Sequence, residues 1–386
     1  MDKVTKEIDY IDQHQQAMID LWKQMVNIDC GSQNKEGVNR VADVIQPILE
    51  GMDFDVKRYP QDKNGDVLIA SDRALDRPVI LLMGHMDTVF KEGEVKSRPF
   101  QIRDGKAYGP GVLDMKGGIT ILLYILKALK NSGFNKYSFK VLLAPDEEVG
   151  HVESKTADIF AEEAKGAAAA FNFETGFLDR SIVTGRKGVC SFYLETFGVS
   201  CHVGNDPENG RSAIREICKK VEDIESLTDF NRAFNLNVGV IQGGTVPNAG
   251  PAYARIDCNF RYPSLEIYKE VMDKVKQIAK KQYIQGTATK LTILPSNGPM
   301  IRLPGVNKLM EAAVKASAAL HIPLPKERYC GGGSDSTIST MEGVPTLCAM
   351  GVLGARNHTK EEFAEVDTLF ERAKLMISII NNLQLG

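Results

Sequence analysis

The chain has 386 residues, a length that favours two domains, with one large α/β domain as the alternative. Its hydrophobic fraction of 43% and charged fraction of 25% are typical of a globular protein. The formal net charge is -3 and the basic residues are scattered, which argues against nucleic-acid binding because that function needs clustered Lys and Arg.

Strand and helix signals alternate in the first part of the chain. Apolar positions at helical spacing predict helices over 5–28, 37–51 and 119–132. Strands are predicted at 53–59, 66–70, 78–84 and 138–145. Because strands that alternate with helices usually pair in parallel, this order predicts an α/β fold with a mostly parallel sheet.

The pattern changes at about residue 187 to the order β-α-β-β-α-β, which is the ferredoxin-like split unit. The strands are predicted at 190–199, 234–242, 253–262 and 288–295, and the helices at 211–227 and 265–282. After about residue 300, a helix at 305–320, a glycine-rich loop and further helix and strand signals return. We therefore expect one α/β domain, 1–186 plus 300–386, interrupted by an inserted domain at 187–299.

The segment GHMDTVF (84–90) follows an apolar run that predicts a buried strand. Side chains at positions i and i+2 of an extended segment point to the same side, so Asp87 can accept the imidazole N–H of His85. That hydrogen bond fixes the tautomer and leaves the other ring nitrogen free for a metal ion. A satisfied polar end of a core strand is the alternative.

Two further segments place acidic residues at turns. GPGVLDMKGG (109–118) puts Asp114 before a predicted helix, where its carboxylate could instead be an N-cap. APDEEVG (144–150) puts three consecutive acids after a buried strand, and a cation would compensate for their repulsion and lost hydration. In extended chain Glu147 and Glu148 point in different directions, so one can bind a metal while the other reaches a bound water. A solvated turn is the alternative.

Glu174 in FNFETG and His358 in GARNHTKEEF are weak candidates when each is taken alone. The combination is stronger, because ligands of an open α/β sheet bind beyond the carboxyl ends of its strands. Two histidines and three carboxylates suit two Zn²⁺ ions with one bridging carboxylate. The four positive charges would be balanced by Asp114, Glu148, Glu174 and a bridging hydroxide, so that the cluster could be buried without a large solvation cost.

The motifs G-H-x-D-T-V, G-x-x-D-M-K-G-G and D-E-E-x-G, in this order, resemble the dizinc aminoacylase/carboxypeptidase metallopeptidase superfamily. The segments GGGSD (331–335) and NHTKEEF resemble its glutamate carboxypeptidase branch. The resemblance implies one zinc held by His85, Asp114 and Glu174, and another held by Asp114, Glu148 and His358, with Co²⁺ or Mn²⁺ as substitutes. It also implies that Asp87 orients His85 and that Glu147 is the general base for a metal-bridging hydroxide.

The resemblance assigns roles to the inserted domain as well, which would be a lid and a dimerisation domain. His202 in VSCHVGNDPENGRSA would stabilise the oxyanion in the partner's active site of a homodimer. Asn248 and Arg261 would grip the substrate, although Arg261 could also be a solvated arginine on the polar face of its strand. Gly332 precedes a predicted helix, where backbone N–H groups can approach a carboxylate.

Some positions depart from the family pattern. HVG replaces the usual HAG after Cys201, and His151 follows DEEVG as a neighbour rather than a ligand. Arg302 is displaced from the position of an arginine that some glutamate carboxypeptidases use for the substrate carboxylate, which weakens the expectation of specificity for a C-terminal glutamate.

The expected function is hydrolysis of an amide bond beside a free carboxylate, with a small peptide or an N-acylated amino acid as substrate. A dipeptidase, a tripeptidase or an N-acyl-amino-acid deacylase is the alternative with the same metal chemistry. A non-catalytic binding protein on this scaffold is disfavoured, because all seven expected ligand, orienting and base positions are filled.

The location is expected to be the cytoplasm. The seven cysteines lack a C-x-x-C pair, which suits reduced thiols. The charged N-terminus lacks the apolar core of a secretory signal, and the longest apolar run is about half of the ~20 residues that a membrane span needs. No nucleic-acid or membrane partner is expected.

Overall fold

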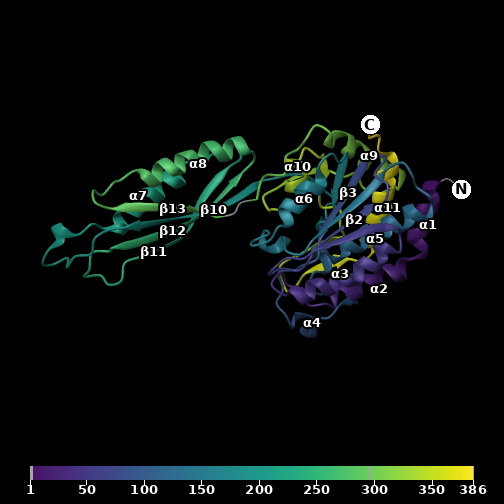
Figure 1. The fold of residues 1–386 in the computed structure, drawn as a ribbon, viewed down its shortest axis with the longest axis horizontal. Coiled ribbons are helices and arrows are strands. Elements are labelled where there is room, and N and C mark those ends of the chain that lie inside the picture. Colours follow the sequence, from purple (N-terminus) through teal and green to yellow (C-terminus); the bar gives the residue numbers. More distant parts are fainter. Residues whose placement is uncertain (1–2, 295–296, 386) are drawn as a thin grey trace. The chain divides into compact units, whose positions relative to one another are not determined.

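The computed structural model describes residues 3–294 and 297–385, which form two compact units (Figure 1). The first unit comprises the chain up to Gly185, Met300–Tyr329, and the chain from Ser334 onward. The second unit comprises Arg186–Pro299 and Cys330–Gly333. The chain therefore leaves the first unit near residue 185 and returns to it near residue 300.

A six-stranded mixed sheet forms the centre of the first unit, in the order β1-β2-β6-β3-β7-β15. Its strands are β1 (Phe54–Tyr59), β2 (Val67–Asp72), β6 (Ser138–Ala144), β3 (Val79–His85), β7 (Ala169–Asn172) and β15 (Thr346–Leu347). The strands β6, β3, β7 and β15 run parallel, and the β1-β2 and β2-β6 pairs are antiparallel. The predicted α/β fold with a mostly parallel sheet is confirmed.

Helices cover both faces of this sheet (Figure 1). One face packs against α1 (Lys3–Gln13), α2 (Gln15–Val26), α3 (Lys35–Glu50), α5 (Gly117–Asn131), α9 (Val306–Ala319) and α11 (Asp367–Asn382). The other face packs against α6 (Thr156–Ala164) and α10 (Ser336–Met341). Alternate residues of β3 belong to the two cores, Ile80 and Leu82 to one and Leu81 and Met83 to the other, so the strand is apolar throughout.

The first unit also contains two smaller sheets and one short helix. Five short strands form the order β4-β5-β17-β16-β8, and β9 pairs with β14. Their bounds are β4 (Gln101–Arg103), β5 (Lys106–Tyr108), β17 (Phe363–Glu365), β16 (Leu353–Ala355), β8 (Gly176–Phe177), β9 (Ile182–Arg186) and β14 (Glu327–Cys330), and the helix is α4 (Glu94–Ser97). The sequence did not predict these strands. The five strands of the larger sheet have only two or three residues each, which is too short to show a period.

The second unit has the predicted β-α-β-β-α-β order. Its elements are β10 (Gly188–Phe197), α7 (Ala213–Glu225), β11 (Asn235–Gly243), β12 (Tyr253–Tyr262), α8 (Leu265–Lys280) and β13 (Ala288–Ile293). The four strands form an antiparallel sheet in the order β11-β12-β10-β13, and α7 and α8 pack on one face of it. Alternate residues of β12 are buried against the helices, namely Ala254, Ile256, Cys258 and Phe260.

The helix predicted over 5–28 is wrong in one respect, because the chain forms two helices that meet at His14. The ring Nδ1 of His14 lies 2.7 Å from the carbonyl oxygen of Tyr10, and the two rings stack with centroids 3.9 Å apart. The His14 backbone N–H bonds to the carbonyl of Ile11 in a tighter turn than an α-helix makes. Apolar periodicity continues through this break and does not reveal it.

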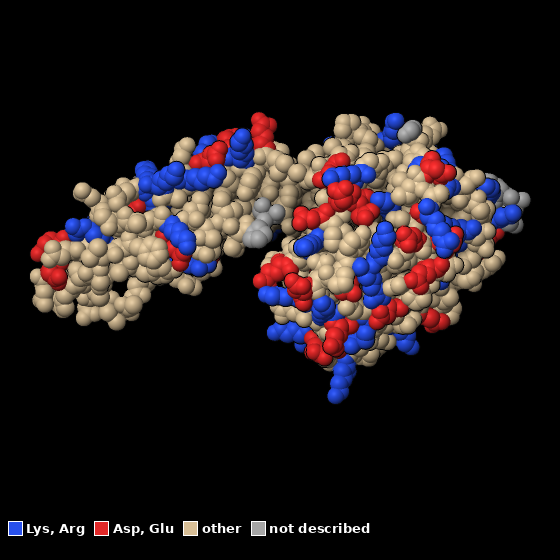
Figure 2. All heavy atoms as spheres, in the orientation of Figure 1, with Lys and Arg blue, Asp and Glu red and all other residues tan. Residues whose placement is uncertain are grey.

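None of the helices in the described parts of the chain is long and apolar enough to cross a membrane. Acidic and basic side chains are interspersed over the visible face (Figure 2), in line with the scattered charges of the sequence.

Candidate metal centre

The expected ligands gather at the carboxyl ends of three neighbouring parallel strands. His85 is the last residue of β3 and pairs with Ala144, the last residue of β6. Glu147 and Glu148 follow β6 in a short helical turn, and Glu174 follows β7. Parallel strands that end together bring side chains far apart in sequence to one edge of a sheet.

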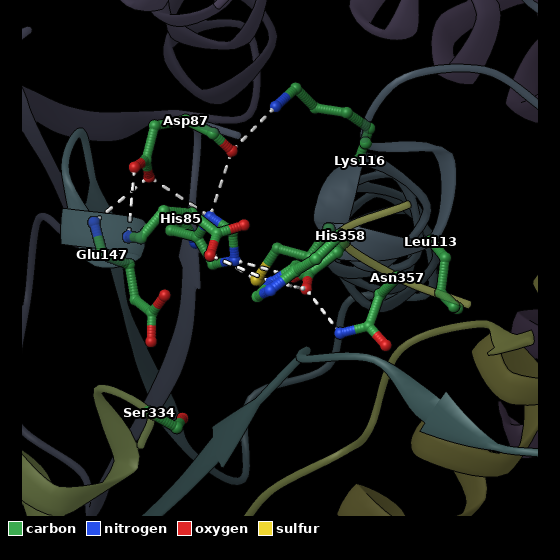
Figure 3. A network of polar contacts seen from close by, with 12 residues as sticks. His85, Asp87, Leu113, Lys116, Glu147, Ser334, Asn357 and His358 are labelled. Carbon is green, nitrogen blue, oxygen red and sulfur yellow. Dashed lines mark hydrogen bonds and ion pairs between the residues drawn. The ribbon is translucent and has the colours of Figure 1, made fainter. Parts of the chain in front are cut away.

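Asp87 lies between His85 and the turn after β6 (Figure 3). Its carboxylate Oδ1 lies 3.2 Å from Nδ1 of His85, and its backbone oxygen lies at the same distance from that nitrogen. The carboxylate also accepts the backbone N–H groups of Glu147 and Glu148, each at 3.2 Å, and the Ser32 hydroxyl at 2.6 Å. One buried carboxylate thus orients the imidazole and fixes the turn that carries both glutamates.

Asp114 lies in a turn, Val112–Lys116, directly before α5. Its Oδ1 lies 3.0 Å from Nε2 of His85, and its Oδ2 lies 3.2 Å from Nε2 of His358. Lys116 occupies the N-cap position of α5, so the Asp114 carboxylate faces the two histidines rather than capping the helix. Asp114 is therefore the residue that the two ligand sets share.

Glycine lets α5 start close to the end of β7. A Cβ on Gly118 would lie 1.9 Å from the carbonyl oxygen of Phe173, the residue before Glu174. Any larger residue at position 118 would push the start of α5, and Asp114 with it, away from Glu174.

Three supporting residues were not predicted. Glu362 is buried and accepts the backbone N–H groups of Gly111, Leu113 and Asp114 at 3.2, 2.8 and 3.0 Å. Lys116 is buried and donates to the carbonyl oxygen of Met86 at 2.5 Å. Asn357 donates to Oδ2 of Asp114 at 3.1 Å. The partners of Glu362 and Lys116 are backbone atoms, which no residue pattern reveals.

Two groups of side chains could each hold a metal ion. One is His85, Asp114 and Glu174, and the other is Asp114, Glu148 and His358. Within each group the candidate ligand atoms all lie within 4.8 Å of one another. Oε1 of Glu148 is buried without a hydrogen-bond partner among the described residues, and a cation would satisfy it. Imidazole with carboxylate is a donor set that suits Zn²⁺, so the residues present fit a pair of divalent ions.

The electrostatics of the site favour added positive charge. Burial lowers the pKa of His85, but its hydrogen bonds to Asp114 and Asp87 outweigh burial and raise the pKa well above its usual value. Hydrogen bonds to Asp114 and Glu148 raise the pKa of His358 to about 10. Burial, with Glu174 nearby, raises the pKa of Glu147. Carboxylates that stabilise the protonated form of two neighbouring imidazoles would also attract metal cations.

The other expected site residues belong to the second unit. His202 is exposed, its Nδ1 accepts the Gly204 N–H at 3.2 Å, and it forms a β-bridge with Ala249, so the segments around His202 and Asn248 lie side by side. Arg261 donates to Asn259 at 2.8 Å and to the Gly331 carbonyl at 3.1 Å.

The glycine-rich loop is held by a second arginine that the sequence did not suggest. Arg186 donates to the carbonyl oxygens of Gly332 and Gly333 at 3.3 and 3.0 Å. Arg302, in the first unit, is occupied by a bidentate ion pair with Glu327 in which both N···O distances are 2.7 Å.

The sequence from residue 81 to residue 382 matches the model of peptidase family M20/M25/M40. The chain belongs to this family. That match covers most of both units and confirms the predicted resemblance. The chain is thus a metallohydrolase.

Individual relatives show the range of activities within the family. Carboxypeptidase G2 from Pseudomonas sp. (strain RS-16) is 28% identical over 96% of this chain and 90% of its own. Succinyl-diaminopimelate desuccinylase from Dechloromonas aromatica is 24% identical over 92% of this chain and 96% of its own. The crystal structure of aminopeptidase PepT from Bacillus cereus has a TM-score of 0.79 at 20% identity and covers 95% of this chain and 98% of its own. These names do not agree on one substrate.

Proposed function

We propose that the protein is a zinc-dependent exopeptidase that cleaves an amide bond beside a free carboxylate, as a glutamate carboxypeptidase does. The observation that carries the proposal is the pair of ligand groups that share Asp114, with the carboxylate of Glu147 beside them. The similarity to Carboxypeptidase G2 over nearly the whole chain supports the choice of substrate class.

His85, Asp114 and Glu174 would hold one ion, and Asp114, Glu148 and His358 the other. When bound, two divalent ions would polarise the scissile carbonyl and lower the pKa of a shared water. Asp87 would keep the His85 ring in the tautomer that binds metal through Nε2. Glu147 would take a proton from the attacking water on a carboxylate oxygen and deliver that proton to the leaving nitrogen.

The second unit would bind substrate and pair two chains. His202 would stabilise the oxyanion in the partner subunit's site, and Asn248, Arg261 and the backbone of Gly332 would contact the substrate. The strand β11 supports a homodimer, because it lies at an edge of its sheet and exposes Val240 and Ile241, which are 45% and 55% accessible. A cytoplasmic location stays a prediction.

A hydrolysis panel on zinc-loaded protein tests the reaction. The panel should contain peptidyl- and folyl-glutamates, dipeptides and N-acetyl or N-succinyl amino acids. We expect the glutamate conjugates to be cleaved fastest, and Glu147→Ala to bind both ions yet lose activity. Full activity of that variant would contradict the role of Glu147.

The second candidate is an N-acyl-amino-acid deacylase. It is favoured by the similarity to succinyl-diaminopimelate desuccinylase. It is also favoured by the ion pair of Arg302 with Glu327, because an arginine engaged in that pair does not bind the carboxylate of a C-terminal glutamate. Preferential cleavage of the N-acyl substrates in the panel would support the deacylase over the peptidase.

The homodimer is tested by mixing two inactive variants. His202→Ala and Glu147→Ala chains should recover part of the activity when subunits exchange, because one site in the mixed dimer keeps both residues. No recovery despite demonstrated exchange would contradict a histidine that acts in the partner's site.

A further inference from the structure

His151 follows the DEEVG segment and bridges two buried carboxylates within the first unit. Its Nδ1 lies 2.8 Å from Oδ1 of Asp146, and its Nε2 lies 2.6 Å from Oδ1 of Asp335. The His151 side chain is 8% exposed, and those of Asp146 and Asp335 are 0% and 5% exposed. Only a doubly protonated imidazole donates from both nitrogens, so His151 acts as a buried cation between two anions.

The protonation state agrees with this geometry. Burial lowers the pKa of His151, but Asp335 and the hydrogen bond to Asp146 prevail and raise the pKa well above its usual value. A neutral imidazole has only one N–H donor, so it could donate to only one of the two buried carboxylates. The second carboxylate would then lose a charged partner, which is costly in a buried position.

The bridge joins the turn that carries Glu147 to the start of α10. On one side, Asp146 directly precedes Glu147. Two backbone hydrogen bonds close this loop: the His151 N–H donates to the Asp146 carbonyl at 3.2 Å, and the Gly150 N–H donates to the Glu147 carbonyl at 2.8 Å. His151 has a φ of 58°, in the left-handed region that non-glycine residues rarely adopt. The chain thus accepts an unfavourable backbone conformation at the residue that makes the bridge.

On the other side, Asp335 is the residue before α10 and is itself fixed. Its neighbours Ser334 and Ser336 both accept hydrogen bonds from the amide of Asn172, the last residue of β7, at 3.0 Å. Asp335 therefore ties the turn after β6 to a loop that is anchored at the end of β7, close to Glu174. The segments that carry Glu147 and Glu174 share one support.

We propose that His151 is a positioning residue for Glu147, acting through the Asp146–His151–Asp335 bridge. The Asp87 carboxylate holds the turn by accepting the backbone N–H groups of Glu147 and Glu148. His151 holds the same turn through the side chain of Asp146. The carboxylate oxygen of a general base must lie within about 2.6–3.2 Å of the atom that carries the proton, so a small shift of this turn lowers the rate. The inference rests on the proposed function, since it gives Glu147 the role of base.

The variants His151→Gln, Asp335→Asn and their combination test the bridge. Because support of this kind is worth about tenfold to a hundredfold in activity, we expect His151→Gln to lower kcat by that factor. KM and the content of two ions per chain should stay as in the wild type. The double variant should be no slower than His151→Gln, because both changes remove one bridge. Additive losses, or loss of an ion, would overturn the proposal.

Thr156→Val is the matched control. The Thr156 hydroxyl donates to the same Oδ1 of Asp146 at 2.8 Å but does not reach across to Asp335. Thr156→Val should keep kcat within about threefold of the wild type, because Asp146 keeps its bond to His151 and the bridge to Asp335 stays intact. If it lowers kcat as much as His151→Gln does, His151 only stabilises Asp146 and the proposal fails. His321→Gln, at an exposed histidine outside this region, controls for removal of an imidazole.

Hydrogen–deuterium exchange measures whether the bridge holds the two loops, and it needs no substrate. Amides in residues 146–151 and 334–338 should exchange about tenfold faster or more in His151→Gln than in the wild type, as expected when a buried charged hydrogen bond is lost. Equal exchange would overturn the bridge. If the wild type cleaves nothing in the panel, the proposed function fails by that result alone, and this measurement still decides whether His151 holds the turn.

Discussion

The two candidate ion positions use the same kinds of ligand but are built differently. The side chain of His85 is 1% exposed, whereas that of His358 is 50% exposed. His85 ends a core strand and is oriented by Asp87, while His358 lies in the loop between β16 and β17 with a φ of 63°. The first position is formed by the sheet itself, and the second is completed by a surface loop.

This difference has a consequence for the order of ion binding. A ligand fixed by burial and by an orienting carboxylate loses little freedom when it binds metal, so the position at His85 should bind more tightly. The position at His358 should exchange its ion more readily because solvent and chelators reach it. Asp114 couples the two positions, since its two oxygens face one histidine each.

The largest effect is expected from Asp114→Ala, which removes the shared ligand. Both ions should be lost, and because a catalytic ion supplies several kcal/mol of transition-state stabilisation, activity should fall at least about a thousandfold. Elemental analysis and initial rates measure the two losses. Asp55→Ala, at an exposed aspartate of β1, is the control. Retention of one tight ion in Asp114→Ala would show that the positions are independent.

The next effect compares the two histidines directly. His358→Ala should keep one ion through dialysis against a chelator. His85→Ala should lose the buried ion, because its affinity for that ion should be at least about a hundredfold weaker than in the wild type. In the wild type, the ion at His358 should leave well before the ion at His85 during chelator titration, as followed by metal content. Simultaneous release of both ions would contradict the difference in burial as the cause.

The same contrast explains how much the sequence predicts. His85, Glu148 and Glu174 stand at or just after strands whose apolar runs are plain in the sequence, so their meeting at one sheet edge follows from the α/β order. The predicted α/β fold and the family resemblance are confirmed. His358 follows no such rule, because its loop joins two strands of three residues each.

Residues that support the site through backbone contacts were not predictable. Glu362 meets three N–H groups of a turn about 250 residues earlier in the chain, as the sequence separations of these bonds show. The sequence predicts His151 only as a neighbour of the ligands, and it does not reveal the second partner, Asp335, which is 184 positions away. Such pairs depend on how loops pack at the sheet edge, and neither apolar periodicity nor motif spacing encodes that packing.

Glu362→Gln should affect both ion positions together, because Glu362 holds the turn that carries Asp114. Glutamine keeps one acceptor oxygen and turns an amide N–H₂ toward backbone donors, so we expect a loss of about 1–3 kcal/mol in the free energy of unfolding. Thermal denaturation and the affinities of both ions measure the effect. Glu365→Gln, at a half-exposed glutamate of β17, is the matched control. A weakening of only one ion would show that the Asp114 turn is fixed by other contacts.

The smallest effect is expected from Asn357→Ala, which concerns only the position completed by the loop. The Asn357 amide donates to Oδ2 of Asp114 at 3.1 Å, the same oxygen that faces His358. Loss of one hydrogen bond to a charged group in an exposed loop should weaken the second ion by about threefold to tenfold, equivalent to ~1 kcal/mol, and leave the buried ion unchanged. Competition with a chromophoric chelator resolves the two affinities. Asn231→Ala, in an exposed loop of the second unit, should change neither. Asn357→Ala could instead lower the affinity for the ion at His85 as much as the affinity for the ion at His358. That result would show that the two oxygens of Asp114 do not act separately and that burial alone does not distinguish the two positions.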